Sequence, residues 1–155
     1  MTKLTTVRGF PYGSAVALLI IGLLLLGGCS LFGGGSSGPK SYTTENDLVV
    51  FTSTVPESVS AGSVFTVQVV VKAKVTLQLA AVTEQLPPGF LAPDGDNSLT
   101  ALGNNMKPGD QVKLTYKVQA SSQTGTFQVW GKARALQTGQ DSVTLMLGSP
   151  VKVVR

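Results

Sequence analysis

The chain has 155 residues, of which 12 are Lys or Arg, 8 are Asp or Glu, one is Cys and none is His. This length accommodates one domain with a sizeable core. The lack of His excludes a Ser-His-Asp triad and imidazole metal ligands, and a single Cys excludes an internal disulfide. The formal net charge is +4, of which Lys3 and Arg8 supply two units. The remaining surplus is too small to indicate nucleic acid as a partner.

Residues 1–28 have the composition of a secretory signal peptide. An uncharged apolar run at 15–26 is shorter than the about 20 residues that a membrane-spanning helix needs. The run ends in Leu26-Gly27-Gly28-Cys29, which resembles the lipobox of bacterial lipoproteins. The resemblance implies cleavage after Gly28 and attachment of fatty acyl chains such as palmitate to Cys29. The alternative is an uncleaved signal anchor in which Cys29 is an incidental buried residue.

The lipobox resemblance also implies a location. Acyl chains on Cys29 would hold the protein by a lipid anchor on the extracytoplasmic face of a membrane in the cell envelope. Ser30 rather than Asp follows the Cys, which by resemblance to lipoprotein sorting favours the outer membrane in a two-membrane organism. Residues 29–41 are rich in Gly and Ser and predict a flexible tether. The globular part is therefore expected at residues 42–155.

Residues 42–155 predict an all-β fold, a single immunoglobulin-like antiparallel β-sandwich. Apolar and polar side chains alternate in 64–75 and in 112–120, which is typical of strands with one buried face. Turns rich in Pro, Gly and Asp separate most of the predicted strands, and no helical stripe is present. The further predicted strands are 48–54, 76–85, 126–136, 142–147 and 151–154.

The segment 84–90, Glu-Gln-Leu-Pro-Pro-Gly-Phe, is similar to the Leu-Pro-x-Gly turn of a large family of immunoglobulin-like surface repeats, catalogued mostly as a domain of unknown function. A Pro-Gly-Asp turn at 108–110 and an alternating strand at 111–120 follow the same family pattern. Where the family often has Asn-Thr-Ala, this chain has Trp130-Gly131-Lys132-Ala133. The resemblance covers roughly residues 55–135 and implies extracytoplasmic spacers, adhesive modules or assembly parts, usually without catalysis.

The acidic residues offer two candidate chemistries. Asp94 and Asp96 resemble the start of a calcium loop, but Leu99 and Asn105 stand where an EF-hand needs Gly and Glu. We interpret the segment as a turn after Pro93, with a looser calcium site at Asp94 and Asp96 as the alternative. Half of the carboxylates adjoin Pro or Gly in predicted turns, and no pair in a desolvated cleft is indicated. The sequence therefore predicts a protein that is not an enzyme and that needs no cofactor.

Trp130 is the candidate binding residue. Strict alternation in 126–136 turns Trp130 outward with Lys132 and Arg134, where an aromatic ring beside cations can stack on a sugar or anchor a protein. Because β-sandwiches usually bury their Trp, we favour the other interpretation, a bulge at Gly131 that reverses the register and makes Trp130 the core aromatic.

We expect 112–120 and 126–136 to form a hairpin across the loop 121–125. Lys113 would then lie opposite Lys132 or Arg134, and Thr115 opposite Trp130 or Lys132. We interpret the cations that this pairing gathers on one surface as serving solubility, with binding to phospholipid headgroups or an acidic glycan as the alternative. The members of this predicted surface are Trp130, Lys113, Lys117, Lys132 and Arg134.

Together these patterns predict a membrane-anchored envelope lipoprotein whose domain is a non-enzymatic protein-interaction or structural module. Such a module would dock an envelope protein of unknown identity through an open strand edge or its outer face. The alternative is a carbohydrate-binding module that holds peptidoglycan or an exopolysaccharide through an exposed Trp130.

Overall fold

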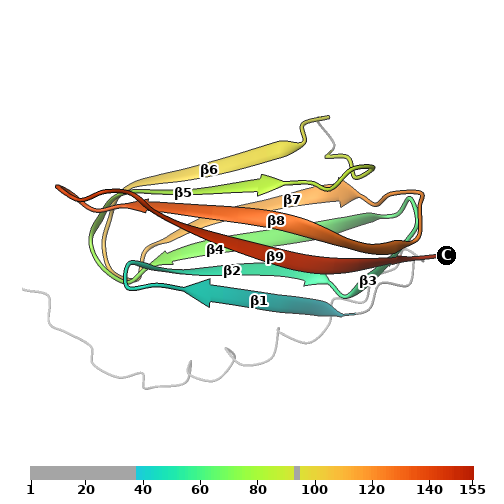
Figure 1. Ribbon diagram of the computed structural model, residues 1–155, viewed down its shortest axis with the longest axis horizontal. Coiled ribbons are helices and arrows are strands. Elements are labelled where there is room, and N and C mark those ends of the chain that lie inside the picture. The colour runs from blue at the N-terminus through green and yellow to red at the C-terminus, as the bar shows by residue number, and fades with distance from the viewer. Residues whose placement is uncertain (1–37, 93–94) are drawn as a thin grey trace, which may run out of the picture. The chain divides into compact units, whose positions relative to one another are not determined.

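The computed structural model describes residues 38–92 and 95–155, which form nine strands in two facing layers (Figure 1). The fold class is the predicted one, an all-β, immunoglobulin-like sandwich. The predicted signal peptide, Cys29 and the tether up to residue 37 lie outside the described residues. The strands are β1 (Pro39–Glu45), β2 (Val49–Pro56), β3 (Ser58–Ser60), β4 (Val64–Ala73), β5 (Leu77–Gln85), β6 (Ser98–Met106), β7 (Gln111–Gln119), β8 (Gly125–Leu136) and β9 (Val143–Val154).

The two layers are a four-stranded sheet in the order β1-β2-β4-β7, here called sheet A, and a five-stranded sheet in the order β3-β9-β8-β5-β6, here called sheet B. Every pair of neighbouring strands is antiparallel except β3 and β9, which are parallel. Strands β6 and β1 lie at opposite margins of the ribbon in Figure 1. Because the two sheets pack face to face around one core, their outer faces point away from each other.

The core lies between the sheets and follows the predicted alternation. In β4, Phe65, Val67, Val69 and Val71 are buried while the residues between them are mostly exposed. In β8, Val129 and the small residues that alternate with it are buried in the same way. The period of two places one face of each strand against the opposite sheet, which is why the sequence pattern locates the core correctly.

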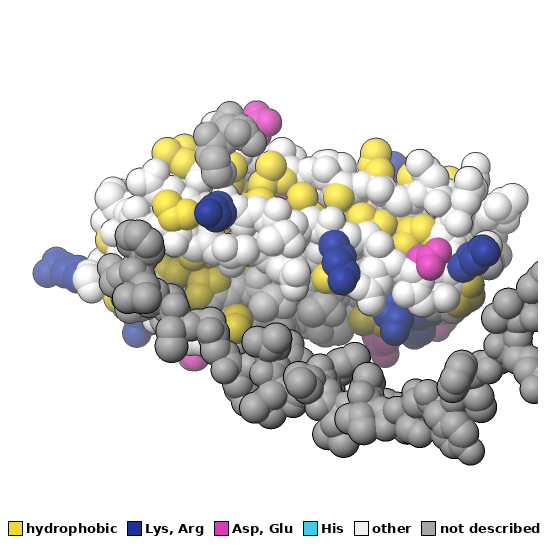
Figure 2. All heavy atoms as spheres, turned by 180° about the vertical axis from the view of Figure 1, so that it is seen from behind, with side chains coloured by type: hydrophobic (Ala, Val, Ile, Leu, Met, Phe, Trp, Pro, Cys, Tyr) yellow, Lys and Arg dark blue, Asp and Glu magenta, His cyan; other side chains and the backbone are white. Residues whose placement is uncertain are grey.

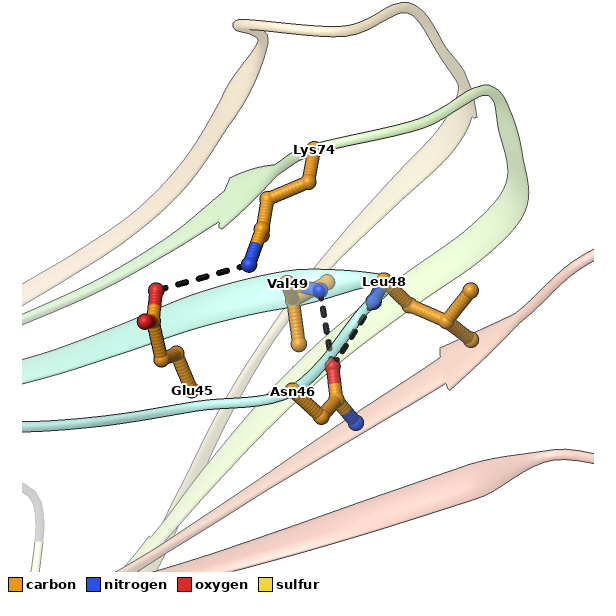
Figure 3. Close-up of polar contacts among 5 residues, drawn as sticks. All are labelled: Glu45, Asn46, Leu48, Val49 and Lys74. Atoms are coloured by element: carbon orange, nitrogen blue, oxygen red, sulfur yellow. Dashed lines mark hydrogen bonds and ion pairs between the residues drawn. The ribbon is translucent and has the colours of Figure 1, made fainter.

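Local side-chain bonds fix the first reversal of the chain. Asn46 lies between β1 and β2, and its Oδ1 accepts hydrogen bonds at 2.9 Å from the backbone N–H groups of Leu48 and Val49 (Figure 3). This side-chain turn positions β1 along β2. Beside it, Lys74 Nζ lies 3.5 Å from Glu45 Oε2, the one ion pair found in the described part of the chain.

The Pro-Pro-Gly segment of the surface-repeat pattern forms a tight turn. The N–H of Phe90 donates to the carbonyl of Pro87, and Gly89 has a φ of 83°, which favours glycine. The turn directs Phe90 into the core, where its ring lies 6.1 Å from that of Phe65 and 5.0 Å from that of Phe127. This turn closes one end of the sandwich.

Four strands differ from the sequence prediction. Strand β1 begins at Pro39, so residues 39–41, assigned to the tether, are part of sheet A. Strand β1 itself was not predicted, and neither were β3, which has three residues, and β6, which carries few β-branched side chains. The predicted strands 142–147 and 151–154 are one continuous strand, β9. Within the described residues, no helix is long and apolar enough to cross a membrane.

Candidate binding face

The predicted hairpin between 112–120 and 126–136 is wrong. Strand β7 is the edge of sheet A and pairs with β4, while β8 lies inside sheet B between β9 and β5. Lys113 therefore pairs with Val70, and Thr115 pairs with Gln68. The predicted surface is divided, because Lys113 and Lys117 lie on sheet A whereas Trp130, Lys132 and Arg134 lie on sheet B.

The end of β7 explains why the chain crosses between the sheets instead of reversing. The N–H of Ala120 donates to the carbonyl of Ser63, and the N–H of Gly62 donates to the carbonyl of Ser121. The side chains of Ala120 and Ser121 are buried. These contacts hold the segment against the turn between β3 and β4, so the following residues enter the other sheet. A five-residue polar loop alone does not distinguish the two connections.

Trp130 is exposed, as simple alternation predicts, and the favoured interpretation of a bulge at Gly131 that buries Trp130 is wrong. Trp130 has 47% of its surface accessible. Strand β8 pairs with β9 residue for residue from Gly125 to Ala135, so the register does not slip at Gly131. Trp130 thus shares its face with Lys132 and Arg134, which are also exposed.

The indole of Trp130 lies across the neighbouring strand. Its partner in β9 is Gly148, and a Cβ placed on Gly148 would come within 3.0 Å of Cζ3 and 3.1 Å of Cη2 of the ring. The absence of a side chain at Gly148 therefore lets the ring rest on the backbone of β9. A ring supported in this way loses little further freedom on binding, because packing already restricts its rotamers.

The surroundings of Trp130 combine cations with apolar and uncharged polar side chains. Gln85 lies opposite Trp130 on β5, and Met146, which lies opposite Lys132, is more than half exposed. None of the residues on this face is acidic, and the described residues form no ion pair with Lys132 or Arg134. We call this surface the Trp130 face; its members are Ala81, Thr83, Gln85, Ser98, Thr100, Leu102, Trp130, Lys132, Arg134, Thr144, Met146 and Gly148.

The outer face of sheet A has a different character. Hydroxyl side chains pair with one another across β1 and β2: Ser41 Oγ lies 2.8 Å from Thr54 Oγ1, and Thr43 Oγ1 lies 3.1 Å from Thr52 Oγ1. Further across the sheet, Gln68 Nε2 lies 3.4 Å from Thr115 Oγ1, beside Lys113 and Lys117. This face therefore satisfies many of its own polar groups. On the side of the molecule in Figure 2, basic side chains stand apart rather than forming a broad patch.

The weak calcium alternative gains no support from the described residues. Asp94 lies outside them, while the segment around Asp96 is exposed. Among the described residues, no group of three or more His, Cys, Asp or Glu side chains is close enough to hold a metal ion. The N–H of Gly95 donates to the carbonyl of Ala92, and residues 93 and 94 lie outside the described residues.

Glu84 is a core residue that the sequence analysis did not identify. Glu84 lies in β5 and points between the sheets, with no accessible surface. Tyr116 donates a hydrogen bond from its hydroxyl to Glu84 Oε2 at 3.1 Å, and Oε1 has no hydrogen-bond partner. Burial raises the pKa of Glu84 to about 7, although the Tyr116 hydrogen bond opposes this shift. Burial, followed by the nearby Glu84 charge, also raises the pKa of Tyr116.

Gly131 makes room for this carboxyl group. Gly131 pairs directly with Glu84, and a Cβ on Gly131 would collide with Glu84 Oε1 and come within 2.5 Å of Phe51 Cζ. Gly131, where the sequence analysis placed a bulge, therefore makes room for the side chains of Glu84 and Phe51. Because Glu84 has no exposed surface, its raised pKa results from burial in the core and does not indicate a substrate site. Alternation along 77–85 is the one signal that points Glu84 inward, since Ala80 and Val82 share its face.

Comparisons with known proteins find similar solved structures but no family. No family model matches the chain, and no curated protein matches it. Among solved structures, the chain is similar to the collagen-binding subdomain of the Enterococcus faecalis surface protein ACE. That likeness has 11% sequence identity and a TM-score of 0.45, and it covers 70% of this chain and 99% of the other.

Proposed function

We propose that this chain is a lipid-anchored module of a bacterial cell envelope that acts by binding, without catalysis, through the Trp130 face. The observation that supports a binding role most directly is the exposed indole of Trp130, seated on Gly148 beside cations that no described acid neutralises. Exposed Trp and Arg side chains are the types that contribute most to protein interfaces. The partner in this proposal is an envelope protein with an acidic surface.

The anchor is the part of the proposal that the lipobox resemblance supports, with Cys29 as the acylated residue. In cells fed a labelled fatty acid, the wild-type chain is expected to incorporate the label, and Cys29→Ala is expected to lose it and to accumulate as precursor. Incorporation into the Cys29→Ala chain, or no incorporation into wild type, would show that the chain is not a lipoprotein. An outer-membrane location is tested by separating the two membranes before the label is counted.

Binding is tested with the full chain as bait on solubilised envelopes. Trp130→Ala is expected to lose the specific partner, while Lys117→Ala, on the outer face of sheet A, is expected to retain it. The matched control removes a large exposed side chain from the opposite sheet without altering the Trp130 face. Equal recovery of the partner by both variants would refute the assignment of this face.

Carbohydrate binding is the second candidate, favoured by the same exposed ring. An indole with one side on the backbone and the other toward solvent can stack on a sugar ring, and Gln85 and Thr83 supply hydrogen-bonding groups nearby. Sedimentation of the chain with purified peptidoglycan or an acidic exopolysaccharide distinguishes this candidate. A Trp130-dependent pellet with glycan alone favours carbohydrate, whereas no pellet leaves the protein partner as the proposal.

A further inference from the structure

The margins of the two sheets offer a second kind of surface. Each edge strand exposes backbone N–H and C=O groups that can pair with another strand, and proteins usually protect such edges with charges, proline or short length. The described sandwich has four edges, β1 and β7 in sheet A and β3 and β6 in sheet B. These four strands differ in how well they are protected.

Three of the four edges are protected. Strand β1 begins with Pro39 and Lys40, and proline cannot donate a ladder hydrogen bond. Strand β3 is only 3 residues long. Strand β7 carries Lys113 and Lys117 along its exposed face, which would meet like charges in any copy of itself. Each of these features opposes pairing with a further strand.

Strand β6 has none of these features. It is 9 residues long, with the sequence Ser-Leu-Thr-Ala-Leu-Gly-Asn-Asn-Met, which contains neither proline nor a charged residue. Leu102, at its centre, has 64% of its surface accessible, which is more than any other large hydrophobic residue of the described chain. A cleft of about 400 Å³ runs between β6 and β7, so this margin is open to solvent. Figure 1 shows β6 at the outer margin of its layer.

We propose that β6 pairs with β6 of a second copy of this chain, antiparallel about a two-fold axis at Leu102. Such a pair places Leu102 opposite Leu102 of the second copy and Thr100 opposite Asn104. The pairing ends there, because Asn105 has a φ of 51° and Met106 turns into the core. The two five-stranded sheets then form one continuous sheet. This inference does not depend on the Trp130 face as a docking site.

The absence of charged residues on β6 explains why the strand that pairs with it belongs to a second copy of this chain. A strand with no charge offers nothing for a charged partner to recognise, yet it meets its own copy without repulsion. The cleft beside it contains one acid and one base, Asp110 and Lys113, so each copy presents both signs to the other. The contact also covers Leu102, which otherwise leaves apolar surface in water.

Disulfide trapping tests this pairing and its register, because directly opposite residues have Cα atoms about 4.5–5.5 Å apart, within disulfide range. The full chain with Cys29→Ala is used, since Cys29 is the only native cysteine. Oxidation of Leu102→Cys is expected to give a covalent dimer of twice the 16.0 kDa chain mass. The control is Val64→Cys, at a position of nearly equal exposure, 62%, on β4, and it is expected to stay monomeric.

A mixture of two further single-cysteine chains tests the two-fold register. Thr100→Cys and Asn104→Cys are expected to cross-link when mixed and oxidised, while neither forms a homodimer alone. Circular dichroism and the melting temperature of the reduced proteins establish that each variant is folded. Cross-linking of Leu102→Cys no faster than Val64→Cys overturns the proposal. Mass spectrometry that finds a different protein on Leu102→Cys in whole envelopes, with no dimer, also overturns it.

Discussion

Sheets A and B distribute their apolar side chains in opposite ways. The inner face of sheet A is built mostly from Phe and Val side chains such as Phe51, Val69 and Val71. Its outer face carries paired hydroxyls and lysines, with Val64 as an exposed apolar residue. The inner face of sheet B includes Ala80, Gly131 and other small residues, while its outer face carries an exposed Trp, Met and Leu. Sheet A thus supplies much of the core volume, and sheet B turns its largest side chain toward the solvent.

This difference separates stability from binding. Removing large apolar groups from the interior of sheet A acts on folding, because burial supplies most of the free energy of folding. Removing Trp130 from the outer face of sheet B removes a side chain that the fold does not need for its core. The exception within sheet B is the pair of Glu84 and Gly131, which lies directly beneath the Trp130 face and controls stability.

The largest expected effect concerns Glu84. Its pKa is about 7 in the folded chain against 4.5 for an unperturbed carboxyl, so the folded state holds the proton more tightly. Stability is therefore greatest at acidic pH and falls as the pH rises from about 4.5 to about 7, by about 3 kcal/mol. Glu84→Gln is expected to remove this dependence and to be more stable than wild type above neutral pH.

Urea unfolding of both chains at about pH 4.5 and about pH 8 measures the effect of Glu84. Tyr116 is the titratable group recorded in contact with Glu84, and its raised pKa keeps it protonated over this range. A wild-type chain whose stability rises over this pH interval would contradict the buried, proton-binding Glu84.

The next effect concerns Gly131 and compares the two sides of sheet B. Gly131→Ala drives a methyl group into Glu84 and Phe51 and is expected to destabilise the fold by about 2 kcal/mol. Gly148→Ala, on the outer side, meets the end of the Trp130 side chain and is expected to cost about 0.5 kcal/mol. Thermal melts of both variants provide the measurement, and equal costs would mean that the inner contact at Gly131 is not tight.

Trp130 itself is expected to matter little for folding. Trp130→Ala should lower the free energy of unfolding by about 1 kcal/mol, well below the cost of truncating a core aromatic residue, because the side chain is already about half exposed. Acrylamide should quench the fluorescence of the single Trp strongly in the native wild-type chain. Weak native quenching, or a large loss of stability in the variant, would indicate a core tryptophan and end the binding assignment.

The smallest expected effect lies on sheet A. Reversing the charges at Lys113 and Lys117 should leave both stability and any binding by the Trp130 face unchanged within error, since solvated surface charges contribute little. The same reversal at Lys132 and Arg134 should weaken binding to an acidic partner, with an effect that shrinks as salt rises. Equal responses from both pairs would mean that general charge, not one face, governs the interaction.

The sequence located the main strands and their buried faces because a two-residue period leaves a direct trace in the order of side chains. It also placed Trp130, Lys132 and Arg134 together, since neighbours along one strand need no tertiary information. It missed β6, whose residues pair with β5 despite few β-branched side chains. The inward direction of Glu84 was available from alternation but conflicts with the usual exposure of a carboxylate.

What the sequence alone determined is the alternation of each strand, the sharp turns at glycine and proline, and the all-β class. Only the tertiary structure decided that β7 and β8 belong to different sheets, which separates Lys113 and Lys117 from Trp130. It also decided that Gly131 makes room for Glu84 rather than for a bulge. The physical reason is that alternation records which way a side chain points relative to its own strand. Strand partners depend instead on contacts between distant segments, such as the hydrogen bonds that tie Ala120 and Ser121 to residues 62–63.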